Sequence, residues 1–210
     1  GGVTNNATLQ FNRSDTITFS NVISDTGAVT KLGAGTLNLT VANSYTGATT
    51  ISAGVVNIQN ATALGTTAGG VTVASGAALQ IQNNITVGAE ALTLNGTGVA
   101  TDGALRNISG TNIYGGAITL GSAVRINSDA GTLTLNNAAA ITATDQNLTV
   151  GGAGATTISG AIATGTGTLT KDGAGTLTLS GANTHSGTTT ISAGILSVGA
   201  GGTAGTVGTG

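Results

Sequence analysis

The sequence predicts an all-β fold in which short parallel strands wind into a β-helix with three strands per coil. Three observations lead to this prediction. The chain of 210 residues contains 37 Gly and no Pro, Cys, Met or Trp, and only 6% of its residues are charged. Short segments alternate apolar and polar residues, and the block at positions 29–58 occurs again at positions 169–198. Together these features are typical of a repetitive, β-rich structural chain.

The composition excludes several other classes of protein. A helical bundle needs helix-forming residues at a period of 3.6 and does not tolerate this much Gly. Collagen needs Gly at every third position together with Pro, and this chain has no Pro. Disordered tails are usually poorly hydrophobic and highly charged, whereas here 39% of residues are hydrophobic and the formal net charge is −2. Without Cys, the chain forms no disulfide and no thiolate metal site.

The strands are predicted from segments in which apolar and polar residues alternate, because alternation places Leu and Ile on one face and Thr or Asn on the other. Glycine-containing breaks separate these segments and supply the conformational freedom that corners need. The predicted strands include residues 36–41, 78–82, 91–95, 132–136 and 176–180. The predicted corners include residues 33–35, 69–70, 115–116, 151–152 and 173–175.

The internal repeat decides among the all-β folds. Residues 29–58 align without gaps to residues 169–198, and 17 of the 30 pairs are identical. Upstream, residues 19–23 resemble residues 158–162 after a shift of one position. Apolar segments recur near positions 36, 55, 78, 104 and 123, in steps of roughly 20 residues, which is the length of one β-helix coil. We therefore expect residues 1–210 to form a single β-helix domain of about ten coils, roughly 45 Å long.

In such a rod the side chains point either into the core or out to solvent. Leu, Ile, Val and Ala point inward and stack on their equivalents in neighbouring coils, whereas Thr, Asn and Ser point outward and keep the surface polar. Backbone hydrogen bonds run along the axis from each coil to the next. The small inward residues predict a narrow core.

The repeated block resembles a known family. Residues 30–39, which begin Thr-Lys-Leu-Gly-Ala-Gly, residues 43–47 and the segment Thr-Thr-Ile-Ser-Ala-Gly at 49–54 are similar to the passenger-associated transport repeat, also called the autotransporter-associated β-strand repeat. Residues 169–198 resemble it at least as closely, with His185 at the position of Tyr45. The resemblance implies a right-handed parallel β-helix in large bacterial proteins that are secreted or displayed at the cell surface. It further implies a role in export and in building stalks.

The charged residues argue against several partners. The five basic residues are scattered, so a nucleic-acid partner is not expected, because such binding needs clustered cations. A membrane-spanning helix needs about 20 consecutive apolar residues, and no apolar run in this chain approaches that length, so no segment is predicted to span a membrane. The basic residues are Arg13, Lys31, Arg106, Arg125 and Lys171.

The ionisable side chains are the candidates for catalysis. His185 is the only His, and we interpret it as an exposed loop residue that replaces Tyr, because a catalytic imidazole needs an acid and a nucleophile beside it. Some β-helix enzymes cleave polysaccharides with clustered carboxylates. Here the acids are spread along the chain, so we interpret them as solvated corner residues, although stacked coils could bring together Asp129 and Asp145, or Asp102 and Arg106. The acids are Asp15, Asp25, Glu90, Asp102, Asp129, Asp145 and Asp172.

The glycine-rich segment, the Asn-x-Thr triplets and the aromatic residues are all interpreted as structural features. Residues 151–155 are rich in Gly but lack the Lys-Ser/Thr of a phosphate loop, so we interpret them as a corner. Asn-x-Thr triplets such as those at Asn38 and Asn147 are expected by chance in this composition. Tyr45 and Tyr114, with Phe11 and Phe19, could anchor a sugar or a partner. The four aromatics are scattered and form no visible platform, and Phe11 and Phe19 are instead expected to plug the first coil. No catalytic residue, cofactor or metal site is predicted.

The two ends shape the functional hypothesis. The chain begins at Gly1 without Met, which suggests a processed form or a fragment, and neither end has an obvious cap over its open strand edge. We therefore expect a non-catalytic structural β-helix outside the bacterial cell that associates end to end into a filament, with a strand such as residues 7–11 completing a neighbour's sheet. The alternative is a stalk segment of a secreted autotransporter or adhesin. The third hypothesis is a glycan-active β-helix enzyme, and contact with a glycan or a cell surface is a further possible partner interaction.

Overall fold

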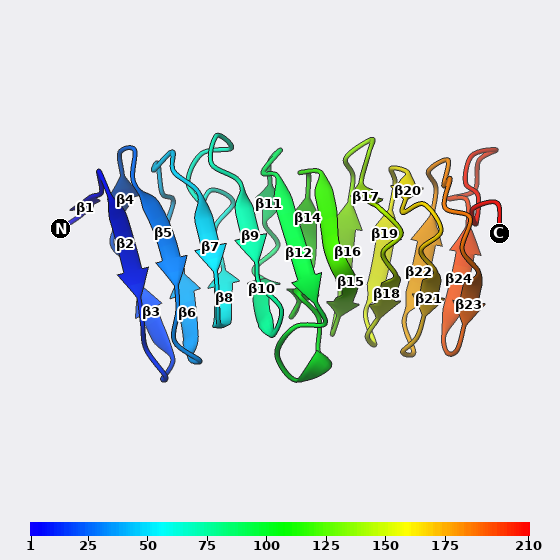
Figure 1. Ribbon diagram of the computed structural model, residues 1–210, viewed down its shortest axis with the longest axis horizontal. Coiled ribbons are helices and arrows are strands. Elements are labelled where there is room, and N and C mark those ends of the chain that lie inside the picture. Colours follow the sequence, from blue (N-terminus) through cyan, green and yellow to red (C-terminus); the bar gives the residue numbers. More distant parts are fainter.

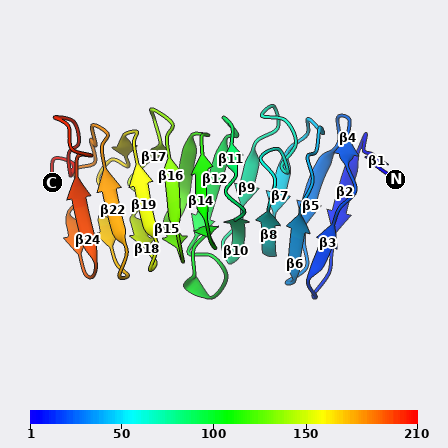
Figure 2. The ribbon, with the colours of Figure 1, turned by 180° about the vertical axis from the view of Figure 1, so that it is seen from behind.

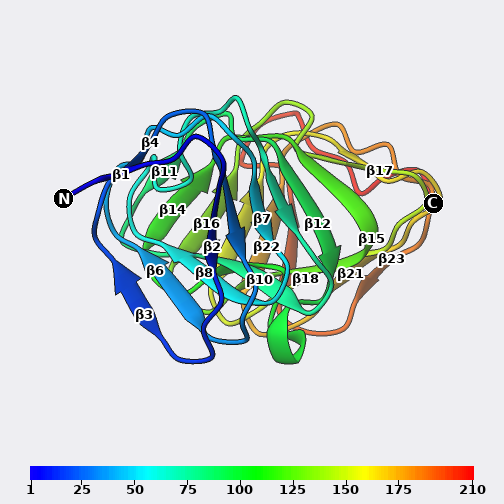
Figure 3. The same cartoon turned by 60° about the vertical axis from the view of Figure 1, so that its left-hand side comes forward.

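The computed structural model describes all 210 residues as a parallel β-solenoid of about nine turns (Figure 1). The strands fall into three ranks that form the walls of the rod, and all of the strand pairs are parallel. The walls surround a common interior, which is visible in Figure 3, where the N-terminal end is turned toward the viewer. The predicted fold class and the three strands per coil are therefore confirmed.

The first rank contains β2 (Thr8–Phe11), β5 (Ala28–Lys31), β7 (Thr49–Ile51), β9 (Val71–Val73), β12 (Leu92–Gly96), the first part of β15 (Ile118–Ser128), β17 (Ile141–Ala143) and β20 (Ile162–Ala163). The second rank contains β3 (Ile17–Phe19), β6 (Thr36–Leu39), β8 (Gly54–Ile58), β10 (Ala77–Ile81), β13 (Leu105–Asn107), the second part of β15, β18 (Leu148–Gly151), β21 (Leu169–Lys171) and β23 (Thr189–Ile191).

The third rank contains β1 (Val3–Thr4), β4 (Ile23–Ser24), β11 (Thr86–Val87), β14 (Thr111–Tyr114), β16 (Thr132–Leu135), β19 (Ala155–Ile158), β22 (Thr176–Leu179) and β24 (Ile195–Val198). In two coils this rank is completed by loops around Tyr45 and Leu64, which lie between β4 and β11 without forming strands. A short 3₁₀ turn, Val99–Thr101, interrupts the coil between β12 and β13.

The coil is right-handed. The near strands β2, β7 and β12 run downward in Figure 1, while the chain advances from the N-terminus on the left to the C-terminus on the right. Seen from behind, β16, β19 and β22 run upward (Figure 2). This sense agrees with the hand that parallel crossover connections adopt.

The core is a continuous cluster of 38 buried residues that runs the length of the rod. In the second rank its members meet in register, as Leu37 lies beside Val56 and Val56 beside Leu79. The apolar segments expected near positions 36, 55, 78, 104 and 123 all belong to this rank, which explains their regular spacing. Outward residues are also aligned, and in the first rank they form a threonine ladder: Thr30, Thr50, Thr72, Thr93, Thr119 and Thr142.

The two copies of the repeat lie on different walls of the rod. In the first copy, β5 and β7 are in the first rank, whereas their equivalents β21 and β23 are in the second. Six turns of the first rank carry the chain from Val29 to Ile162. Leu169, the equivalent of Val29 in the second copy, follows Ile162 on the next wall. The repeat therefore specifies how two successive coils pair, and not which wall they occupy.

Close stacking of coils explains several glycines at the corners. A Cβ atom built on Gly33 would lie 2.2 Å from the carbonyl oxygen of Arg13 in the preceding coil, and one on Gly35 would lie 2.0 Å from that of Asp15. Both distances are far below van der Waals contact. Any side chain at these positions would force neighbouring coils apart.

We predict that Gly33→Ala lowers the free energy of unfolding by about 2–4 kcal/mol, since the coils must separate locally and lose packing. Gly88→Ala is the matched control, because no atom lies within 4 Å of a Cβ built there and its backbone conformation is open to other residues. Urea denaturation of both variants measures the difference. Equal stability of the two variants would contradict this explanation of the corner glycines.

Candidate functional site

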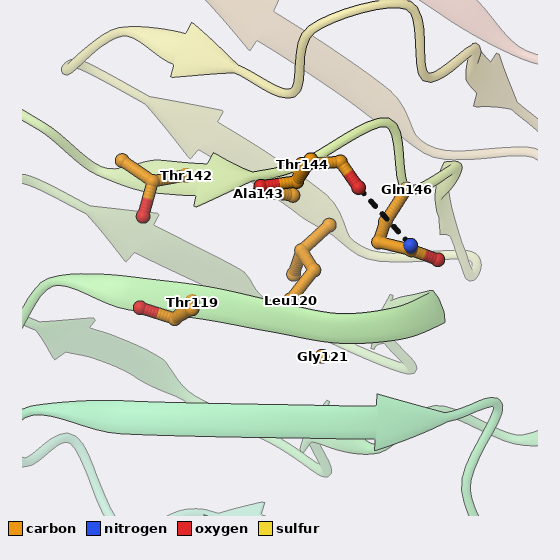
Figure 4. Close-up of a pocket in the computed structure, with 7 residues that line it drawn as sticks. All are labelled: Thr119, Leu120, Gly121, Thr142, Ala143, Thr144 and Gln146. Carbon is orange, nitrogen blue, oxygen red and sulfur yellow. Dashed lines mark hydrogen bonds between the residues drawn. The ribbon is translucent and has the colours of Figure 1, made fainter.

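The surface has two hollows. The larger, of about 450 Å³, lies where β15 and β17 meet the loop that follows β17 (Figure 4). Gln146 Nε2 donates a hydrogen bond to the carbonyl oxygen of Thr144 at 3.1 Å across its rim. The lining offers hydroxyl and amide groups and no ionisable side chain, so this hollow suits a polar, uncharged ligand. The residues that line it are Thr119, Leu120, Gly121, Thr142, Ala143, Thr144 and Gln146.

The smaller hollow, of about 200 Å³, lies beside the loop that connects β8 to β9 and contains one ionisable residue, Glu90. Glu90 is only 3% exposed, and its Oε1 atom has no hydrogen-bond partner. Burial raises the pKa of Glu90 to about 7, and hydrogen bonding from the backbone of Gly70 offsets only part of this rise. The expectation that all of the acids are solvated corner residues is therefore wrong for Glu90, because its side chain is buried.

Stacking does bring other acids together. Asp102 and Asp129 both accept hydrogen bonds from the Arg106 guanidinium, at 3.1 and 2.8 Å. The Arg125 guanidinium instead donates to both carboxylate oxygens of a single residue, Asp172, at 2.6 and 2.8 Å.

Asn127 joins these two ion-pair groups into one ladder. Its side chain donates to Asp129 at 2.7 Å and accepts from Arg125 at 3.1 Å. The ladder is half-buried on the second wall and lies outside both hollows. Of the two pairs suggested by the sequence, Asp102 and Arg106 do meet, whereas Asp145 instead accepts the backbone N–H of Thr166 at 2.8 Å.

His185 is fully buried, so the interpretation of this residue as an exposed loop side chain is wrong. Thr189 Oγ1 lies 3.0 Å from His185 Nε2 and donates its proton to the carbonyl oxygen of Val207, so the imidazole is the donor in the His–Thr bond. In the other copy, the Tyr45 hydroxyl lies 2.6 Å from Thr49 Oγ1. His185 therefore replaces Tyr45 as an inward bridge to a threonine four residues later. Burial lowers the pKa of His185.

The remaining aromatics are also structural. Tyr45 and Tyr114 are fully buried, so neither side chain is available at the surface to anchor a sugar or a partner. Burial raises the pKa of both phenols above the usual value for tyrosine. Phe11 and Phe19 pack edge to face with ring centres 5.0 Å apart in the first coil, as expected.

Two groups of residues that sequence reasoning missed hold successive coils together. Lys31 and Lys171 are buried at equivalent positions in the two repeat copies. The Lys171 ammonium donates to the carbonyl oxygens of Asp172 at 2.6 Å, Gly173 at 2.8 Å and Ala193 at 3.2 Å, and Lys31 similarly binds Gly33 and Ala53. Burial lowers the pKa of both lysines.

The second group is a pair of equivalent asparagines. Asn43 accepts from the backbone N–H of Ile23 in the preceding coil at 2.9 Å and donates to the carbonyl oxygen of Ala63 in the following coil at 2.6 Å. Asn183 bridges Ile162 and Thr206 in the same way. The identity of these residues in both copies was the available signal, but identity alone does not distinguish an inward bridge from a surface residue.

Comparison with known proteins agrees with the repeat. The model of the passenger-associated transport repeat matches residues 29–58 and 169–198. The chain is also 36% identical, over 182 residues, to the adhesin BmaC autotransporter of Brucella suis biovar 1 (strain 1330). This alignment covers 86% of the chain but only 4% of that adhesin. No solved structure matches the chain.

The fold contains no helix long and apolar enough to cross a bilayer. No three or more His, Asp or Glu side chains lie close enough together to hold a metal ion.

We predict that Lys171→Met lowers the free energy of unfolding by about 2–4 kcal/mol, because it leaves buried carbonyl oxygens of two coils without their donor. Thr170→Ser changes the adjacent outward side chain and should have little effect. Chemical denaturation near neutral pH compares the two. If the methionine variant were as stable as the parent, the ammonium would not be what holds these corners.

From the raised pKa of Glu90 we also predict that the stability of the folded chain depends on pH. Its pKa in the folded state is about 7, above the usual 4.5. At a pH between these two values, the folded chain therefore retains a proton on Glu90 that the unfolded chain releases. Stability relative to Glu90→Gln should therefore fall as the pH rises from about 4.5 to 7, by roughly 3 kcal/mol, and then level off. Denaturation midpoints of both proteins across this range test it, and a constant difference would contradict it.

Proposed function

The chain carries two passenger-associated transport repeats on a parallel β-solenoid, and from this we propose that it is a non-catalytic stalk segment of a secreted bacterial autotransporter or adhesin, placed at the cell surface. The similarity to an autotransporter adhesin supports this proposal. The chain spans a small part of that relative. The role we propose for it is to supply length and rigidity to the stalk.

The exposure of equivalent residues in the two repeat copies carries the proposal. Ile51 on β7 is fully buried beneath the next coil, whereas its equivalent Ile191 on β23 is 54% exposed. Likewise Ile58 on β8 is fully buried, whereas Val198 on β24 is 51% exposed. The second copy thus has the same inward residues without the coil that covers them in the first, and a stalk that continues past β24 would bury them.

The ion pairs of the acids also support a non-catalytic role. A retaining or inverting glycosidase needs two carboxyl groups facing a substrate-binding groove. Here Asp102 and Asp129 are both engaged by Arg106, and Glu90 is the one acid that lines a hollow. This arrangement favours the stalk over a glycan-active enzyme.

End-to-end association of separate chains is a second candidate function that the same exposed edge supports. Val22 is 46% exposed, and the outer edges of β2 and β3 in the first coil are unpaired. A second copy could therefore add its first coil to β23 and β24. The stalk proposal differs in that the covering coil comes from the same polypeptide.

A graft tests whether a further coil covers the exposed edge, as the stalk proposal requires. Residues 59–81 follow the first repeat copy and cover β7 and β8, so placing this segment after Val198 should cover β23 and β24 in the same manner. We expect the graft to raise the free energy of unfolding by about 2–5 kcal/mol through burial of Ile191, Ile195 and Val198. A graft that left stability unchanged would contradict the stalk proposal.

The association state of the ungrafted chain completes the test. Sedimentation velocity over a range of protein concentrations measures whether separate chains join. If they join through this edge, Ile191→Glu should abolish association, and the outward neighbour Thr190→Glu should not. A monomer at all concentrations would exclude end-to-end assembly and leave the stalk proposal intact.

A further inference from the structure

Glu90 is the exception in a column of small residues. The corner between the third and first walls is occupied in successive coils by equivalent residues, and all of the others lack a side chain or carry only a methyl group. The register of the first rank places them in line: Gly27, Gly47, Gly69, Glu90, Gly116, Ala139 and Gly160. One coil therefore has a carboxyl side chain at a position where the other coils have no side chain or only a methyl group.

The neighbouring coil leaves room for this side chain. Between β8 and β9 the third wall is built by a loop instead of a strand, and Gly65 of this loop lines the hollow without contributing a side chain. The result is the hollow of about 200 Å³ described above. Its lining combines hydroxyl groups from Ser44, Thr62, Thr66 and Thr67 with the aliphatic side chains of Leu64 and Val87.

The carboxyl group in this hollow has no counter-ion from the protein. Its Oε1 atom is unpartnered, and none of the five basic residues lines the hollow. The titratable groups whose charge coupling reaches Glu90 are the phenols of Tyr45 and Tyr114, which are buried and stay neutral. Buried charges in proteins are normally paired. A cation that enters the hollow would supply the missing partner.

The lining indicates which kind of cation fits. A metal ion prefers several charged or carbonyl oxygens, whereas this hollow offers a single carboxylate and has aliphatic walls. An organic ammonium ion needs one carboxylate for its charge, hydroxyl oxygens for its remaining N–H groups and an apolar surface for its carbon chain. We propose that the hollow binds a small aliphatic ammonium ion, with the nitrogen on Glu90 and the carbon chain against Leu64 and Val87.

The test titrates the whole chain with propylammonium while amide signals are followed by NMR at about pH 8, where Glu90 is mostly ionised. We expect saturable shifts confined to residues around the hollow, such as Gly65 and Gly88. Propanol, which has the same carbon chain without the charge, should produce no such shifts. Glu90→Gln should weaken binding by at least about tenfold, because it removes the charge and keeps the shape.

A second variant keeps the test decisive if Gln is poorly accommodated. Glu90→Ala installs the residue found at Ala139 in the same column, so it should fold, and its unchanged amide spectrum away from the hollow verifies this. It should also lose propylammonium binding. Equal binding by either folded variant, equal shifts with propanol, or no saturable shifts at all would overturn the proposal. Localised shifts with calcium chloride alone would also overturn it, by identifying a metal site.

Discussion

The hydrogen-bonded contact between successive coils is the constraint on which the rest of the structure depends. Parallel strands in a sheet lie about 4.8 Å apart, and every wall of this rod must keep that spacing at once. The corners have the least room, as the distance of 2.0 Å from a Cβ built on Gly35 to the Asp15 carbonyl oxygen shows. Composition follows from this geometry, since glycine fits the corners and Leu, Ile and Val fill the narrow interior.

The same constraint leaves buried polar groups at the corners, and the repeat contains the side chains that bind them. The Lys171 ammonium spans carbonyl oxygens of adjacent coils, and Asn43 connects the coil before it to the coil after it. Both side chains act along the axis, as the backbone ladder does. The unit of stability is therefore a pair of neighbouring coils, which is what the repeat encodes, and this explains why its two copies can lie on different walls.

The fold could be predicted from the sequence because its signals are local: alternation defines the strands, and the regular recurrence of apolar segments defines the coils. Whether an individual polar side chain is buried or exposed could not be predicted in this way. His185 was expected in an exposed loop, yet it is buried against Thr189, and Glu90 was grouped with solvated acids, yet it lies in a hollow. A polar residue in a loop points inward only when the neighbouring coils leave space and a partner, and the residues that decide this lie a whole coil away in the sequence.

The alignment of equivalent residues along one wall can be measured directly. The chain has no Cys, so cysteines introduced at Thr30 and Thr142 would carry the only two spin labels. These residues lie five coils apart in the threonine ladder of the first wall. Strand spacing then predicts a narrow distance distribution centred at about 24 Å between their backbones. A broad distribution, or a distance incompatible with five coil spacings, would contradict the solenoid register.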